Sequence, residues 1–368
     1  MKYRQIERRI SKAVNVGGIT IGAGAPVSIQ SMTTTQTADV KATLEQINQL
    51  AQAGCDLVRV AAATKQDTSA LSEIVAASPV PIIADVHFNY ERALEAIHAG
   101  VHKIRLNPGT ISDRQAVRTI IKACKDAHIP IRVGVNEGSV IYRFNQERRE
   151  KQFARPLDEI MVEAIEEYLE IFHECDFSDL VLSAKSHDAA TTIAVNRELA
   201  RKYDYPLHLG LTHAGTVRTG SVRSICAVAT LLAEGIGDTI RISLAGDPVE
   251  EVALAKELLA ALRLREPDGV EIIACPTCGR TTADVAGIAE QLRQALVDIK
   301  QHITVAVMGC VVNGPGEAGQ VDVALCCGKN NASIFREGKF VRTVPMEKVI
   351  DEMITEVRKM ADSRKVRK

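Results

Sequence analysis

Three cysteines in the C-terminal third of the chain have the type and spacing expected of metal ligands. Cys275 and Cys278 form a C-x-x-C pair, and Cys310 follows about 30 residues later at the start of a Gly/Pro-rich loop. A C-x-x-C turn places two sulfurs within reach of one ion, and a third thiolate completes most of a coordination shell. The sequence therefore predicts a metal centre in this region.

Zinc and an iron–sulfur cluster are the two candidates for this centre. A four-cysteine zinc site usually has a second C-x-x-C pair, and the sequence contains none. Glycines and a proline around Cys310 let the backbone approach a bulky cluster, and three thiolates without a strong fourth ligand leave one iron open to substrate. Spacing leaves the fourth ligand open between Glu317, Cys326, Cys327 and no residue. At most one of the adjacent cysteines can join, because neighbours on a strand face opposite sides.

The chain before residue 264 repeats one pattern that must position any further site. A β-branched apolar run, a turn and a helical stretch recur eight times, with runs beginning near residues 27, 57, 81, 102, 131, 179, 207 and 239. Eight such units are typical of an α/β fold closed as a (β/α)8 TIM barrel. A doubly wound open sheet is the competing fold, but no G-x-G-x-x-G turn follows the first run.

The remaining segments complete a two-domain organisation. We expect a substrate-binding barrel over 1–264, opened by a hairpin around Gly17-Gly18 that plugs its bottom, and a smaller α+β domain over 265–368 that carries the cysteines. The charged stretch 142–156 predicts an exposed excursion from the fifth unit. Helices are expected over 40–54, 90–100, 113–128, 157–175, 189–203, 221–235, 282–299 and 346–361, and second-domain strands over 270–274, 303–307, 321–325 and a hairpin through 333–344.

The late positions of the barrel strands carry polar residues. Residues i and i+2 of a strand share a face, and catalytic residues of TIM barrels lie at the carboxyl ends of the strands. Asp85 and His87 share one such face, His213 follows the seventh run, and His208 earlier in that run is expected in the core. Five cations converge on the same mouth: Arg59, Arg105, Arg132, Lys185 and Arg241.

These cations predict an anionic ligand. Asp85 is the obvious counter-charge at a strand end, with Glu137 and Asp247 in adjoining loops. Cations buried together without partners are costly, and a ligand with two or more phosphate-like charges would offset that cost. Further hydrogen-bond donors come from Asn107, Asn136, Ser183 and Ser243.

Composition excludes several other functions. Lys+Arg (45) balance Asp+Glu (46), and aromatic residues are 4% with no Trp, so we expect no nucleic-acid partner. We expect no membrane association, because no run of 18 apolar residues exists, and no signal peptide, because the N-terminus lacks an apolar core. Nine cysteines in so large a chain suit a reducing cytoplasm.

Several motifs resemble those of the 4-hydroxy-3-methylbut-2-enyl-diphosphate synthase family, in its bacterial two-domain form. The likeness extends from about Val16 to Lys348. It rests on Ile29-Gln30-Ser31-Met32-Thr33, Arg105-Leu106-Asn107-Pro108-Gly109, Gly134-Val135-Asn136, Arg241-Ile242-Ser243-Leu244, Ala274-Cys275-Pro276-Thr277-Cys278-Gly279-Arg280 and Gly309-Cys310-Val311-Val312-Asn313-Gly314-Pro315-Gly316-Glu317-Ala318.

The resemblance implies a specific chemistry. The substrate would be 2-C-methyl-D-erythritol 2,4-cyclodiphosphate, opened and dehydrated by two single electrons from flavodoxin or ferredoxin. A [4Fe-4S] cluster would be bound by Cys275, Cys278, Cys310 and the carboxylate of Glu317. In a head-to-tail homodimer, the cluster domain of one subunit would cap the barrel of the other. Candidate catalytic residues are then Asp85, His87, His213 and Glu317.

One position departs from the family pattern. The family usually has Thr-Glu-Ala-Gly or Thr-Glu-Ser-Gly after the seventh strand, where this chain has Thr212-His213-Ala214-Gly215. A histidine can act as a general acid near neutral pH, or it can mark a weakened relative. The competing hypothesis from another class is a non-redox barrel that binds a phosphorylated or pterin-like ligand and carries a structural zinc domain.

Overall fold

The computed structural model describes residues 5–146, 154–267, 269–310, 316 and 318–365. The chain divides into two compact units, Met1–Arg265 and Glu266–Lys368. None of the described helices is long and apolar enough to cross a membrane.

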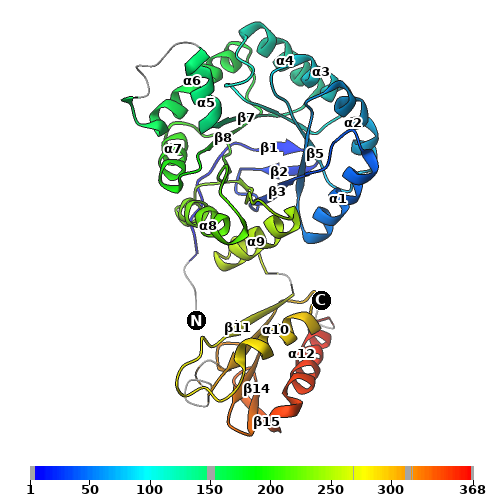
Figure 1. Ribbon diagram of the computed structural model, residues 1–368, viewed down its shortest axis with the longest axis vertical. Coiled ribbons are helices and arrows are strands. Elements are labelled where there is room, and N and C mark those ends of the chain that lie inside the picture. Colours follow the sequence, from blue (N-terminus) through cyan, green and yellow to red (C-terminus); the bar gives the residue numbers. More distant parts are fainter. Residues whose placement is uncertain (1–4, 147–153, 268, 311–315, 317, 366–368) are drawn as a thin grey trace. The chain divides into compact units, whose positions relative to one another are not determined.

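The first unit is a barrel of eight parallel strands, as the sequence predicts (Figure 1). In space the strands follow the order β8-β7-β6-β5-β4-β3-β10-β9, and a bridge between Leu182 and Leu207 joins β8 to β9. The strands are β3 (Ser28–Met32), β4 (Leu57–Ala61), β5 (Ile82–Asp85), β6 (Lys103–Leu106), β7 (Ile131–Asn136), β8 (Leu180–Lys185), β9 (His208–Leu209) and β10 (Thr239–Ile240).

Helices surround the barrel (Figure 1). They are α1 (Val40–Ala53), α2 (Lys65–Ala77), α3 (Tyr90–His98), α4 (Arg114–Ala127), α5 (Glu137–Gln146), α6 (Leu157–Glu174), α7 (Ala189–Lys202), α8 (Val217–Ala233) and α9 (Pro248–Ala261). Aspartate, asparagine or threonine side chains cap most of their N-termini, as in the capping box that Thr64 and Asp67 form on α2. In the fifth unit, residues 142–146 of the charged stretch continue α5, and Tyr142 among them is exposed. Residues 147–153 lie outside the described part of the chain.

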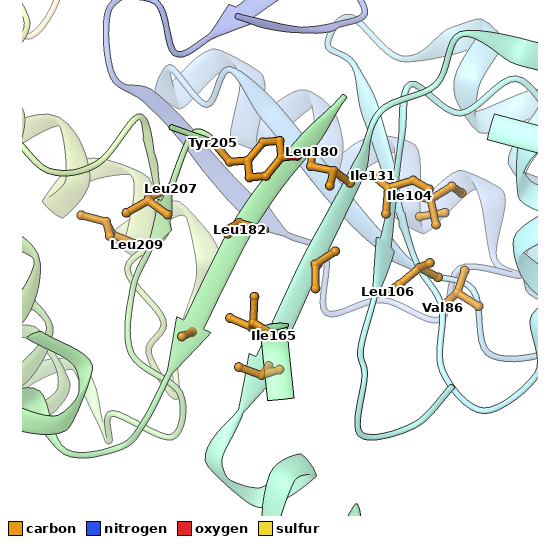
Figure 2. Packing of buried hydrophobic residues seen from close by; sticks show 14 of the residues in the cluster. Val86, Ile104, Leu106, Ile131, Ile165, Leu180, Leu182, Tyr205, Leu207 and Leu209 are labelled. Carbon is orange, nitrogen blue, oxygen red and sulfur yellow. The ribbon is translucent and has the colours of Figure 1, made fainter. Parts of the chain in front are cut away.

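Side chains alternate along each strand between two environments. One set packs in the apolar core between the strands and the helices, and the other points toward the barrel axis. On β6, Ile104 and Leu106 pack outward into the core shared with the helices, and so do Ile131 on β7 and Leu182 on β8 (Figure 2). The residues between them face the barrel axis. The barrel thus presents its polar strand residues to one another, as the i, i+2 pattern predicts.

A hairpin precedes the barrel. Strands β1 (Val14–Val16) and β2 (Ile19–Ile21) pair antiparallel, as expected from the Gly17-Gly18 turn. Their buried residues Val14, Val16 and Ile21 form a small core with Leu57, Ile83 and Val181 from β4, β5 and β8. The hairpin therefore packs against the early, N-terminal ends of the barrel strands.

The second unit is a mixed five-stranded sheet with two main helices. The strand order is β11-β12-β13-β14-β15, in which the first three strands are parallel and the last two antiparallel. Its elements are β11 (Val270–Ala274), α10 (Val285–Ala295), β12 (Ile303–Met308), β13 (Val323–Cys327), β14 (Asn331–Arg336), β15 (Lys339–Pro345), the 3-10 turn η2 (Met346–Lys348) and α12 (Val349–Lys365). Helix α10 is shorter at both ends than the expected 282–299.

Candidate active site

A cavity of about 210 Å³ opens at the carboxyl ends of the barrel strands. It brings together the cationic and polar residues that the sequence places at the strand ends, with Gly134, Leu211 and Thr212 added. Its predicted lining residues are Arg59, Asp85, His87, Arg105, Arg132, Asn136, Ser183, Lys185, His213, Arg241 and Ser243.

Asp85 is the centre of one charged group in this cavity. Arg105 Nη1 lies 3.0 Å from its carboxylate, and Arg59 Nε lies 3.7 Å away. Burial by itself would raise the pKa of Asp85, but the two guanidinium groups outweigh it and hold the pKa well below its usual value. The Asp85 carboxylate is therefore ionised and committed to two arginines, which leaves it a poor proton donor.

His87 is held by the same group. Arg105 Nη1 donates to His87 Nε2 at 2.6 Å, and His87 Nδ1 lies 3.3 Å from Thr110 Oγ1. An arginine has no acceptor, so this geometry assigns the ring hydrogen to Nδ1. A second nitrogen of Arg105 is directed elsewhere, since Nη2 donates to the Gly134 carbonyl at 3.0 Å. The group holds Arg105 and His87 in fixed orientations at the cavity wall.

Arg241 has a partner that sequence reasoning missed. Glu251, from the first turns of α9 and only 3% exposed, receives Nε and Nη2 of Arg241 at 3.1 and 3.2 Å. The same carboxylate accepts from Leu244 N at 3.0 Å and from Ser31 Oγ at 3.1 Å. Of the loop acids we expected to balance the cations, Asp247 instead caps α9. Glu137 begins α5 and accepts from Ser186 Oγ and His187 Nδ1.

Arg132 and Lys185 are the two cavity cations that form no ion pair with Asp85 or Glu251. Both are buried, and no salt bridge joins either to a carboxylate within the described ranges. Nε and Nη1 of Arg132 have no hydrogen-bond partner in the part of the chain that the structure describes. Lys185 Nζ contacts the ring nitrogen Nε2 of His208 at 3.2 Å. Burial, and then the surrounding arginines, hold the pKa of Lys185 well below its usual value.

Gly210 makes room for this arrangement. A Cβ on Gly210 would lie 2.3 Å from the Arg241 carbonyl oxygen and 2.7 Å from Lys185 Nζ. The Arg241 carbonyl belongs to the backbone of the neighbouring strand and cannot move aside easily, so the position requires glycine. Arg241 and Lys185 therefore lie close against the backbone of the strand end that precedes His213.

Two predicted residues lie differently from the rest. Asn107 does not line the cavity, because its Oδ1 accepts from Gly109 N at 3.0 Å within its own turn. His213 lines the cavity but is exposed, with a positive φ of 50° and Nδ1 3.2 Å from Thr212 Oγ1. A non-glycine residue in this conformation is uncommon and marks a position worth testing.

The cysteines of the second unit follow the ends of two neighbouring strands. Cys275 comes directly after β11, and its backbone N–H donates to the Val307 carbonyl on β12 at 3.0 Å. Cys310 follows β12, and the peptide before it is tied to the Cys278 turn, because Gly309 accepts from Thr282 N. Cys275 and Cys310 are partly exposed and Cys278 is exposed. Soft thiol donors at adjacent strand ends suit an iron–sulfur cluster.

The other possible ligands are placed as follows. Cys326 and Cys327 face opposite sides of β13, as predicted, one packing with Met308 and the other with the helix side of the sheet. Burial raises the pKa of both thiols to about 11. Glu317 lies outside the described residues. Within the described ranges, no three His, Cys, Asp or Glu side chains are gathered closely enough to hold a metal ion directly.

The fold and the two groups of residues define a class of protein: a TIM barrel with a cation-lined cavity, joined to a smaller domain whose cysteines follow neighbouring strands. The family model for the GcpE TIM-barrel domain matches residues 11–256, and that for the GcpE protein C-terminal domain matches residues 271–359. The chain belongs to the GcpE family, which confirms the resemblance read from the motifs.

Curated relatives carry one name. A protein of Clostridium perfringens is 46% identical over 349 residues, covering 95% of this chain and 98% of its own length. One of Thermodesulfovibrio yellowstonii is 47% identical over 354 residues, covering 96% and 100%. Both are named 4-hydroxy-3-methylbut-2-en-1-yl diphosphate synthase (flavodoxin). Among solved structures, a dihydropteroate synthase of Xanthomonas albilineans is similar at a TM-score of 0.48 and 14% identity, covering 69% of this chain and 97% of its own.

Family membership decides between the hypotheses left open by the sequence. The chain is an oxidoreductase of isoprenoid biosynthesis, of a family that implies an iron–sulfur cluster. The non-redox barrel with a structural zinc domain is not favoured.

Proposed function

We propose that the protein converts 2-C-methyl-D-erythritol 2,4-cyclodiphosphate into (E)-4-hydroxy-3-methylbut-2-enyl diphosphate by reductive ring opening and loss of water. The observation that carries this proposal is the cation surplus of the barrel. Five cations line the cavity, while Asp85 and Glu251 carry two negative charges and form ion pairs only with Arg59, Arg105 and Arg241. A cyclic diphosphate supplies the negative charge that Arg132 and Lys185 lack.

Other cavity residues bind and orient this substrate. Asn136, Ser183 and Ser243 provide neutral hydrogen-bond groups around the charged cluster. Asp85, held ionised by its arginines, fixes Arg59 and Arg105 and therefore acts through them. His213 is exposed at the mouth and is proposed to donate the proton that the leaving hydroxyl needs, in place of the family glutamate.

The cluster is proposed to be [4Fe-4S], bound by Cys275, Cys278, Cys310 and Glu317. When bound, it supplies two single electrons received from flavodoxin or ferredoxin. The donor set supports this assignment, since soft thiols that follow two neighbouring strands suit iron, and a carboxylate would be a more readily displaced fourth ligand than a thiolate. We further propose a cytoplasmic homodimer in which the cluster domain of one subunit caps the barrel of the other.

Anaerobic purification tests the proposal. The protein is expected to be brown, with visible absorbance that bleaches on reduction, and to convert the cyclic diphosphate when reduced flavodoxin is supplied. Cys310→Ala should lose most of its iron and its turnover, whereas Cys226→Ala, an exposed cysteine of α8, should keep both. Colourless protein with stoichiometric zinc would refute the proposal. If Glu317→Ala left iron content and turnover unchanged, the assignment of Glu317 as the fourth ligand would be wrong.

A further inference from the structure

The barrel interior below the cavity is polar, although interiors of TIM barrels are usually filled by branched apolar side chains. Five inward-facing residues of β3, β6, β9 and β10 form this floor, and each is at most 3% exposed: Ser28, Gln30, Lys103, His208 and Thr239. Among the described residues, no hydrogen-bond partner is found for Lys103 Nζ, for either amide atom of Gln30 or for His208 Nδ1. The floor therefore offers nothing negative to the cations above it.

The charged side chains that act most strongly on Lys185 are all cations. From the other strands it faces Arg132, Arg59, Arg241 and Arg105, with the His208 ring at 3.2 Å and Lys103 beyond that ring. Asp85 and Glu251, the carboxylates of the site, are bound to arginines.

In a buried cluster of cations that holds no anion, repulsion favours the loss of a proton from one of them. Guanidinium groups stay protonated in proteins, whereas a buried lysine amine can lose its proton. Burial and the same cations also hold the pKa of His208 well below its usual value, so its ring is neutral. Lysine is thus the side chain that can relieve the repulsion.

We propose that Lys185 is a substrate-linked proton acceptor positioned by His208: it is an uncharged amine in the empty cavity and takes one proton from solvent when the diphosphate binds. In the bound state its ammonium donates to the substrate and to Nε2 of the neutral His208 ring. This inference rests on the proposed substrate. It adds a role for a histidine that the sequence assigns only to the core.

The linkage has a defined sign. The lowered pKa of Lys185 in the empty cavity leaves it uncharged above that pKa, and the bound dianion raises the pKa again toward the ordinary value of 10.5. Proton uptake on binding is therefore expected at a pH between the pKa of Lys185 in the empty cavity and its pKa in the complex. Below the lower of these two pKa values Lys185 is already charged, and binding should take up no proton.

Calorimetric titration tests the inference. The unreduced holoenzyme is titrated with the cyclic diphosphate at one pH in two buffers of different ionisation enthalpy, so that binding is measured without turnover. The ligand keeps one acidic oxygen on each phosphorus, both ionised at neutral pH, and contributes no proton of its own. Wild-type protein should take up about one proton per site.

Variants identify the acceptor. Lys185→Arg keeps a permanent cation and should bind with no uptake, and Lys185→Met should bind more weakly with no uptake. Lys125→Arg, at an exposed lysine of α4, should behave as wild type. His208→Leu should move the midpoint of uptake to lower pH, because the ammonium loses its acceptor, while His208→Gln should restore it in part.

Two results would overturn the inference: binding to wild type without proton uptake, or uptake by Lys185→Arg equal to that of wild type. Neither would touch the proposed function, which fails instead if the cyclic diphosphate does not bind or is not converted by the reduced enzyme.

Discussion

Glu251 provides the sharpest test of how the cation cluster is held together. Its buried carboxylate meets Arg241 twice and also accepts from Leu244 N and Ser31 Oγ. Glu251→Gln keeps the size of the side chain but removes the charge. Breaking a buried ion pair from one side costs about 3–5 kcal/mol, because the remaining charge stays buried without compensation.

The expected effect on stability is large enough to measure. A loss of about 3 kcal/mol lowers the melting temperature of a domain of this size by about 6 °C or more. Thermal unfolding of wild type, Glu251→Gln and Glu250→Gln at neutral pH measures it. Glu250 is the matched control, since it lies on the same turn of α9 but is exposed.

The ligand adds a second arm to this test. Saturating cyclic diphosphate should reduce the difference in melting temperature between Glu251→Gln and wild type, because the ligand supplies negative charge that the variant lacks. The reasoning would be refuted if Glu251→Gln melted within about 1 °C of Glu250→Gln, or if the ligand increased the difference from wild type.

Two further predictions concern the same cavity. Arg132→Met should melt at a higher temperature than wild type without ligand, because burying a charge without a carboxylate partner costs several kcal/mol, which the apolar side chain avoids. The variant should also bind the cyclic diphosphate about 10- to 100-fold more weakly by calorimetry. A variant that is both less stable and unimpaired in binding would contradict this. The pKa of Asp85 in the folded protein lies well below the ordinary value of 3.8, so the contribution of this carboxylate to stability is present above about pH 4 and is lost as the pH falls. Urea unfolding from pH 7 to pH 3 should therefore show Asp85→Asn and wild type converging toward low pH, and a constant difference would contradict the sign.

Much of the barrel could be predicted because its strands are continuous buried runs. The i, i+2 alternation was enough to place Arg59, Arg105, Arg132, Lys185 and Arg241 around one cavity, since strand geometry alone decides which residues share a face.

The missed features depend on three-dimensional packing. Glu251 reaches Arg241 from a helix, so no strand periodicity points to it, although an acidic first turn directly after the eighth strand is a usable signal. Asn107 was assigned to the ligand because it ends a strand, but an Asn-Pro-Gly sequence more often uses the amide in its own turn, as here. The polar floor was missed because Lys103 and His208 lie in otherwise apolar runs. The charge of the stretch 142–156 predicts exposure but does not specify secondary structure, and residues 142–146 extend a helix that begins at Glu137.

The short bridge between β8 and β9 has a mechanical consequence. Other neighbouring barrel strands are joined by ladders of two to six residue pairs, whereas here Leu182 pairs with Leu207, supported by hydrogen bonds from Leu182 N to Pro206 O and from Thr212 N to Ser186 O. Among the described barrel strands this seam has the shortest ladder, and its amides should exchange with deuterium sooner than those of β6 and β7. Lys185 and His208 lie on either side of it, so their contact joins the two strands. If opening of the seam breaks this contact, we expect the opening of the barrel wall and the protonation of the lysine to affect one another.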